Sequence, residues 1–342
     1  MRPCTATLLC LLLGSWGTDL RGQVPVEALA KPPAEAQTYL LVSPGGTHGQ
    51  VRLWSLPDGT RMSRDSMALR GMVTELDVRL HLAPDGLPDD LEVRGVTPSG
   101  DAAETFRRGG GKARWKSPLD AGELATQGPA LYLPAGGGFV LHTAHLIEAL
   151  LAAKDHSLAL LPGGRARAER LTQLTLAGPS PKVVVCWAVH GLANAPIPVW
   201  TDAEGRFFGA IQGLGALPRA HADRLQDLTK AQDDALAAQS PALAKALLRT
   251  PKGPVAFTHA RVFLDGRRFV EDHTVVVEKG LITQVGPSAS LPVPPGAEVL
   301  DARGKTLVPG LWDSHMHVSD DSTGPFLLAL GITSLRDPGN DD

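Results

Sequence analysis

Apolar and polar residues alternate along the chain from Tyr39 to about Trp115. In the run LDVRLHL (76–82), every second residue is apolar and the residues between are charged or polar. Successive side chains of a strand point to opposite faces, so this run predicts a strand with one face in a core and one in water. Similar runs are separated by Pro/Gly turn signals at 44–46, 57–59, 84–86 and 98–100. The pattern predicts an antiparallel sheet.

Residues 139–154 show a different period, because their apolar residues recur at helical spacing in FVLHTAHLIEALLAAK. More strand-like segments follow, so we predict an N-terminal antiparallel β-rich domain with one helix over 37–215. Residues 216–250 are rich in Ala and Leu around Pro241 and predict a helical connector. A second β section begins near Val255, with turns predicted at 265–266, 279–280 and 303–304.

The first 22 residues are typical of a signal peptide and leader. Arg2 precedes the apolar run 6–13, and Ser15 and Gly17 are small residues suited to cleavage after Gly17. The run is too short to span a bilayer as a helix. We expect an exported protein, periplasmic or secreted; a buried hydrophobic terminus, a membrane tether or a lipid anchor on Cys10 are the alternatives.

Composition narrows the function further. The formal net charge is −3, with 33 basic and 36 acidic side chains, which gives no electrostatic footprint for nucleic acid. After removal of residues 1–22, Cys186 would be the only remaining cysteine, and its apolar surroundings predict an inert core thiol. We therefore expect no disulfide framework, no nucleic acid partner and no transmembrane span.

Candidate metal chemistry lies in the stretch LVPGLWDSHMHVSD (307–320). His315 and His317 are two residues apart, so on a strand their imidazoles would point to one face, and imidazole is a common zinc ligand. Asp313 would share that face and could orient the site, whereas Met316 would point into packing. A histidine pair alone is a weak signal, because such pairs are often structural.

The surrounding sequence makes the signal specific. VLDARGK, LVPGLWDSHMHV and LLALGITSLRDPGN occur in order, and with the β section before them they resemble the amidohydrolase superfamily over about 254–340. The resemblance implies that 254–306 is a small β-sandwich segment and that 307–342 is the start of a metal-dependent (β/α)₈ barrel. It places His315 and His317 as metal ligands at the end of barrel strand 1, and Arg336 and Asp337 at the end of strand 2, where we assign neither a catalytic role.

The same resemblance implies a divalent metal, zinc being the first choice, that activates water to attack an amide, lactam, peptide-like or related bond of a small-molecule or peptide-like substrate. A complete barrel needs roughly 250 residues, whereas 36 residues run from Leu307 to Asp342. We therefore expect an incomplete N-terminal fragment that is inactive alone, with its catalytic residues unknown. The alternative is a non-catalytic exported β-rich binding or scaffold protein with a vestigial barrel start.

Other candidate features favour structural interpretations. His142 and His145 have a spacing that can bind metal, but we expect both on the polar side of an amphipathic helix. The glycine runs 109–111 and 136–138 lack the Gly-Lys-Ser/Thr ending of a phosphate-binding loop. The domain at 37–215 could bind a lipid-like or peptide ligand; bracing the barrel is the favoured role.

Overall fold

The computed structural model describes residues 24–178, 180–318 and 323–339, so the predicted signal peptide and leader lie outside the described residues. The chain divides into two compact units. The first comprises residues up to 168 with 175–185 and 198–227, and the second comprises 169–174, 186–197 and 228 onward. No helix in the described part is long and apolar enough to cross a bilayer.

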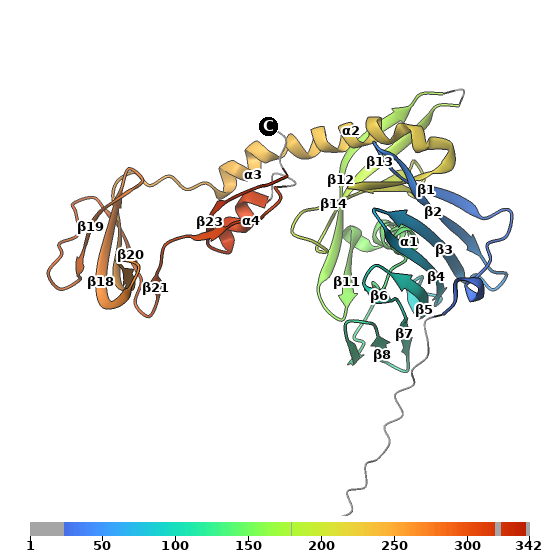
Figure 1. Cartoon of the computed structure of the whole chain (residues 1–342), viewed down its shortest axis with the longest axis horizontal. Coiled ribbons are helices and arrows are strands. Elements are labelled where there is room, and N and C mark those ends of the chain that lie inside the picture. Colours follow the sequence, from blue (N-terminus) through green and yellow to red (C-terminus); the bar gives the residue numbers. More distant parts are fainter. Residues whose placement is uncertain (1–23, 179, 319–322, 340–342) are drawn as a thin grey trace, which may run out of the picture. The chain divides into compact units, whose positions relative to one another are not determined.

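A single large sheet dominates the region up to residue 218, which makes the chain β-rich as predicted (Figure 1). Among the described residues it has sixteen strands, in spatial order β10 (Ala130–Tyr132), β11 (Ser157–Leu161), β12 (Arg165–Leu176), β13 (Lys182–His190), β14 (Ile197–Asp202), β15 (Phe207–Gln212), β16 (Leu214–Pro218), β1 (Gln37–Ser43), β2 (Gly46–Ser55), β3 (Arg61–Leu69), β4 (Met72–Leu82), β5 (Pro88–Thr97), β7 (Glu104–Gly109), β8 (Lys112–Lys116) and β9 (Ala121–Ala125), while β6 (Gly100–Asp101) pairs with β5. The pairings from β16 through β1 to β5 are antiparallel, and β10 pairs with β11 in parallel.

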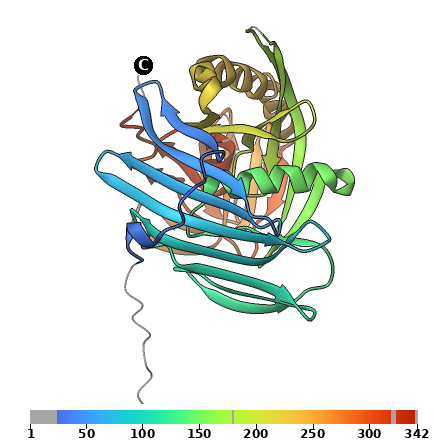
Figure 2. The same cartoon turned by 90° about the vertical axis from the view of Figure 1, so that its right-hand side faces the viewer.

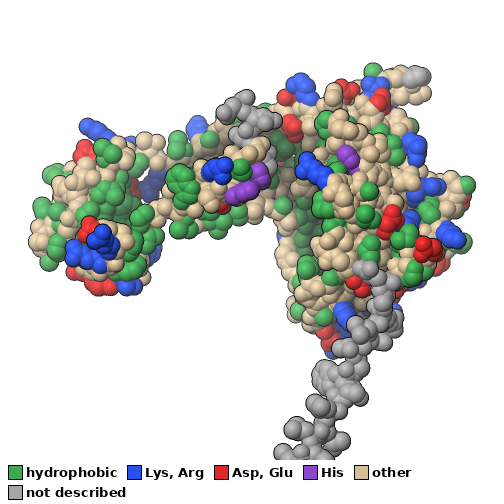
Figure 3. All heavy atoms as spheres, in the orientation of Figure 1, with side chains coloured by type: hydrophobic (Ala, Val, Ile, Leu, Met, Phe, Trp, Pro, Cys, Tyr) green, Lys and Arg blue, Asp and Glu red, His purple; other side chains and the backbone are tan. Residues whose placement is uncertain are grey.

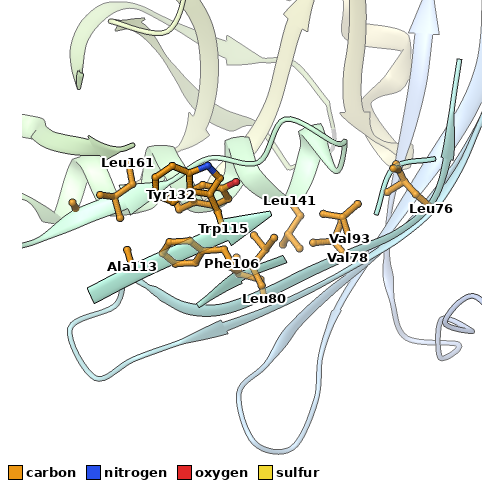
Figure 4. Packing of buried hydrophobic residues seen from close by; sticks show 13 residues of the cluster. Leu76, Val78, Leu80, Val93, Phe106, Ala113, Trp115, Tyr132, Leu141 and Leu161 are labelled. Carbon is orange, nitrogen blue, oxygen red and sulfur yellow. The ribbon is translucent and has the colours of Figure 1, made fainter. Parts of the chain in front are cut away.

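The sheet curls until its two end strands come near each other. β9 and β10 are at opposite ends of the strand order, yet only residues 126–129 join them, and five steps of extended chain span at most about 17 Å. The ring of Tyr132 on β10 stacks on Phe106 of β7, with centroids 4.3 Å apart and planes 7° apart. Figure 4 shows these rings inside one apolar cluster with residues of β4, β5 and β8. The core therefore lies on the concave face.

Helix α1 (Phe139–Ala152) lies in the curve of this sheet (Figure 2) and confirms the helix predicted at 139–154. The glycine run before it is explained by close packing: a Cβ at Gly138 would lie 2.5 Å from Val78 Cγ2, and Gly138 has a φ of +79°. His142 and His145 are both buried, so the prediction of a polar helix face is wrong. All residues of α1 from Val140 to Ile147 are buried, whereas Phe139 at its start is 47% exposed.

The remaining elements before residue 254 are short helices. They are η1 (Val26–Ala28), η2 (Lys154–His156), η3 (Arg219–Arg224), α2 (Leu225–Ala237) and α3 (Ser240–Leu247). Pro241 stands in the first turn of α3, where its missing N–H costs nothing. Cys186 on β13 is fully buried, as predicted, and burial raises the pKa of its thiol to about 12.

The second unit contains a smaller sheet. Its strands are β17 (Val255–Leu264), β18 (Arg268–Glu278), β19 (Leu281–Pro287), β20 (Glu298–Asp301) and β21 (Thr306–Leu307). They form one sheet in the order β19-β18-β17-β20, with β21 also on β17. A small core around Ala260, Val262 and Val275 covers part of it. The predicted sandwich segment is thus one sheet in the described residues, and a facing sheet stays a prediction.

Candidate metal centre at the end of β22

The predicted histidine pair follows a short β-α-β unit. β22 (Leu311–Asp313) pairs in parallel with β23 (Ile332–Leu335), and α4 (Thr323–Ala329) lies between them in sequence. Gly310 permits the close approach of the two strands, because a Cβ there would overlap the side chain of Thr333. The order strand, helix, parallel strand agrees with the sequence pattern. In the described residues these two strands form a two-stranded sheet, and a barrel stays a prediction.

Backbone contacts between the two strands continue beyond Asp313. The N–H of Arg336 donates to the Asp313 carbonyl at 2.8 Å, and the N–H of Met316 donates to the Arg336 carbonyl at 3.1 Å. β22 itself is shorter than predicted, since the histidines follow the strand and are not part of it. They still lie at its carboxyl end, because these contacts hold the segment beside β23.

The two imidazoles lie side by side. The ring centroids of His315 and His317 are 5.3 Å apart, and their planes are at 87°. Both side chains are exposed, and Figure 3 shows histidine in purple on the surface of the segment that carries α4 and β23.

Asp337 reaches the pair from the end of the neighbouring strand. One carboxylate oxygen lies 3.2 Å from His317 Nδ1 and accepts the N–H of Gly339 at 3.0 Å; the other accepts the N–H of Val318 at 2.9 Å. The two backbone donors, Val318 first, hold the pKa of this carboxyl below its usual range, and His317 adds to the effect. A carboxylate at Nδ1 favours the tautomer with its proton there, which leaves Nε2 free to bind a metal.

This contact of Asp337 was not predicted from the sequence. From the sequence, Arg336 and Asp337 are placed at the end of strand 2 and are assigned no catalytic role. The signal was available: the carboxyl ends of adjacent parallel strands meet at the same edge of a sheet, so residues just after β22 and β23 must be neighbours. Asp313 has a lesser role, since its Oδ1 accepts the backbone N–H of His315 at 3.0 Å.

The two imidazoles are suitable metal ligands, but they are fewer than a divalent ion normally takes from a protein. Two imidazoles fit zinc or a similar divalent ion, which normally takes three or four protein ligands. Among the residues that the structure describes, no three His, Cys, Asp or Glu side chains are grouped to hold a metal ion. His315 and His317 are brought together, and Asp337 is committed to orienting His317.

Comparison with known proteins supports the sequence pattern. No family model matches the chain. The chain is 36% identical over 84 residues to an adenine deaminase from Ruegeria sp. (strain TM1040), a match covering 25% of this chain and 14% of that protein. It is 43% identical over 53 residues to an imidazolonepropionase from Idiomarina loihiensis, covering 16% and 13%. It is 50% identical over 46 residues to a dihydroorotase from Trichlorobacter lovleyi, covering 14% and 10%.

These relatives all belong to the amidohydrolase superfamily, and the resemblance found in the sequence is confirmed for a part of the chain. The chain spans about a seventh of the length of the first two of these relatives. A crystal structure of a prolidase complexed with N-methylphosphonate-L-proline is 27% identical over 26% of each chain, with a TM-score of 0.23, and carries no argument about the fold.

Proposed function

We propose that this chain contributes the first two metal ligands, His315 and His317, of an amidohydrolase-type enzyme. The observation that carries the proposal is their placement: two imidazoles lie side by side at the carboxyl end of β22, and Asp337 from the end of parallel β23 binds one of them. In barrel enzymes this edge of the sheet carries the active site.

The chemistry would be metal-assisted hydrolysis. A divalent ion, zinc in our proposal, would lower the pKa of a bound water and polarise the bond under attack. The chain's own residues would supply two neutral imidazole nitrogens, and Asp337 would fix the ring of His317. The names adenine deaminase, imidazolonepropionase and dihydroorotase support a small-molecule substrate containing C–N bonds, and a peptide-like substrate belongs to the same proposal.

We propose that further polypeptide completes both the metal site and a (β/α)₈ barrel. The exposed apolar side chains of this segment support the idea, since parallel strands are normally covered on both faces. They are Val308, Leu311, Trp312, Val318, Leu328 and Leu330. The 342-residue chain alone is then inactive. Export to the periplasm or beyond, directed by residues 1–22, is part of the proposal.

A non-catalytic binding or scaffold role is the second candidate. It is favoured by the large curled sheet, whose sixteen strands lie before residue 219 and include neither His315 nor His317. In that case the β-α-β unit would be vestigial. The two functions differ in whether the histidines can support catalysis once the rest of a barrel is present.

A chimera tests this difference. Residues 307–339 of this chain replace the segment that they resemble in a curated relative, and hydrolysis by the zinc-loaded chimera is measured. We expect activity that His315→Ala and His317→Ala abolish. A folded chimera that binds zinc without any turnover would favour the vestigial role. Turnover by the 342-residue chain itself, lost in His315→Ala, would show that the incompleteness proposal is wrong.

A further inference from the structure

Helix α1 carries an unusual polar stripe into the interior of the curled sheet. His142, His145 and Glu148 follow one another at three-residue intervals and therefore share one side of the helix. His142 is 7% exposed and His145 is 4% exposed. Nε2 of His142 and both ring nitrogens of His145 are buried and have no hydrogen-bond partner among the described residues. Buried polar atoms of native proteins nearly always have one, so the stripe requires an explanation.

The surroundings of the two rings disfavour positive charge. Burial is the largest cause that lowers the pKa of His142, the nearby His145 ring lowers it further, and a backbone hydrogen bond with Gly137 opposes the change. Arg61 on β3 is the charged group that acts on His145, and its guanidinium is already paired with Glu148 at 2.7 Å.

Among the described residues, no carboxylate raises the pKa of either ring. β11 and β15, which pack on α1, carry no titratable side chain. η2 carries Lys154, Asp155 and His156 at the far end of the helix. A proton on either ring would therefore be buried beside a second imidazole or a guanidinium, with the nearby carboxylate already used.

We propose that this histidine pair is an acid-sensitive latch, which holds α1 in the curve of the sheet while both rings are neutral and releases it when they take up protons. The helix is the element that would move, because it carries both rings, and Glu148 on the same side of the helix links it to β3 through Arg61.

The direction of the pH dependence follows from the burial of the rings. Burial lowers the pKa of His142 to about 3 and the pKa of His145 to about 4. A released histidine has a pKa near 6.5. The released form therefore binds more protons between about pH 6.5 and 4, and the latch weakens as the pH falls through this window.

Asp65 changes the proton balance of release in the opposite direction to the two histidines, over the same pH range. It stands two and four residues from Ser63 and Arg61 on β3, so the three share the face that meets α1. Burial raises the pKa of Asp65 to about 7, and the Ser63 hydroxyl donates to its Oδ1 at 2.8 Å. The closed form thus keeps a proton on Asp65 that the released form gives up above about pH 4. On release of α1, His142 and His145 together gain two protons and Asp65 loses one, so the released form carries one more proton than the closed form.

Amide hydrogen exchange along α1 measures release directly. Protection factors of the amides of 143–150 are determined between pH 6.5 and 4.5 in the full chain, after correction for the intrinsic exchange rate. One net proton predicts that the opening equilibrium rises about tenfold per pH unit on acidification. In Asp65→Asn, which keeps the acceptor for Ser63, the rise becomes about a hundredfold per unit.

Substitution of the histidines should make the pH dependence weaker, whereas Asp65→Asn makes it steeper. His145→Leu loses no hydrogen bond, and in this variant the pH dependence of the opening equilibrium should vanish. In the double variant His142→Asn/His145→Leu the pH dependence should reverse sign. His156→Asn, at the other end of α1, is the control and keeps the wild-type slope, since Asn tolerates the φ of +48° found there. A wild-type slope in the double variant would overturn the proposal. So would an Asp65→Asn slope equal to that of the wild type.

Discussion

The large N-terminal sheet and the β22–α4–β23 unit bury their apolar side chains very differently. Inside the sheet, Val78, Leu131 and Trp200 have no exposed surface. In the smaller unit, Trp312 is 69% exposed and Leu328 is 64% exposed. The residues that determine stability and the residues that match a catalytic motif therefore lie in different regions. The sheet has its own core, whereas the unit with the histidines has apolar surface that only further packing would cover.

The largest effect should come from the core of the sheet. Phe106 is 1% exposed and stacks on Tyr132. Phe106→Ala should lower the free energy of unfolding by about 3–5 kcal/mol, because it removes a buried ring and leaves a cavity. Urea unfolding followed by circular dichroism measures this. A loss below about 1 kcal/mol would mean that the two ends of the sheet do not pack as described.

Loss of a buried carboxylate should come next. Glu104 is 1% exposed and accepts hydrogen bonds from the Tyr132 hydroxyl and from the N–H groups of Ala135 and Gly136. Glu104→Ala leaves these donors unpaired and should cost about 3 kcal/mol in the same urea assay.

The matched control for that change is Glu123→Ala. Glu123 is an exposed carboxylate that pairs with Lys112 and Arg114 at the surface. Its removal should change the free energy of unfolding by less than about 1 kcal/mol, because surface ion pairs contribute little. Equal losses in the two variants would contradict the described burial of Glu104.

A change beside the metal ligands should alter binding but not stability. Asp337→Asn weakens the contact that orients His317 and should reduce zinc affinity by roughly 10- to 100-fold. Isothermal titration calorimetry of the chain with zinc measures this, and Asp265→Asn on an exposed turn is the control. Unchanged zinc affinity would remove Asp337 from the site.

The smallest effect on stability is expected at Trp312. Because its ring is largely exposed, Trp312→Ser should change the free energy of unfolding by no more than about 0.5 kcal/mol. It should also reduce self-association in sedimentation velocity runs, since less apolar surface is presented. A loss comparable to that of Phe106→Ala would mean that the unit has a covered core.

Local patterns predicted the elements whose faces differ in polarity. The alternation in 76–82 lies within β4, and the helical period of 139–154 matches α1. The apolar pattern is weakest in β3, because its inward positions include Ser63 and Asp65. The same polar interior made His142 and His145 look like surface residues. The curl of the sheet could not be predicted, since it depends on pairings between strands far apart in sequence.

The candidate site was predicted as far as its motif extends. His315 and His317 follow from two-residue spacing and from the resemblance. The contact between His317 and Asp337 joins residues twenty positions apart and depends on the parallel pairing of β22 with β23. The metal ligands themselves stay a prediction, because only the positions of the rings are described.

Zinc titration of the chain labelled with ¹⁵N in its histidine rings tests the central claim most directly. We predict that the Nε2 resonance of His317 and a ring nitrogen of His315 shift together at the same zinc concentration, while those of His259 and His273 do not move. Separate transitions for His315 and His317, or no shift of either ring before the control histidines respond, would contradict a shared metal site at the end of β22.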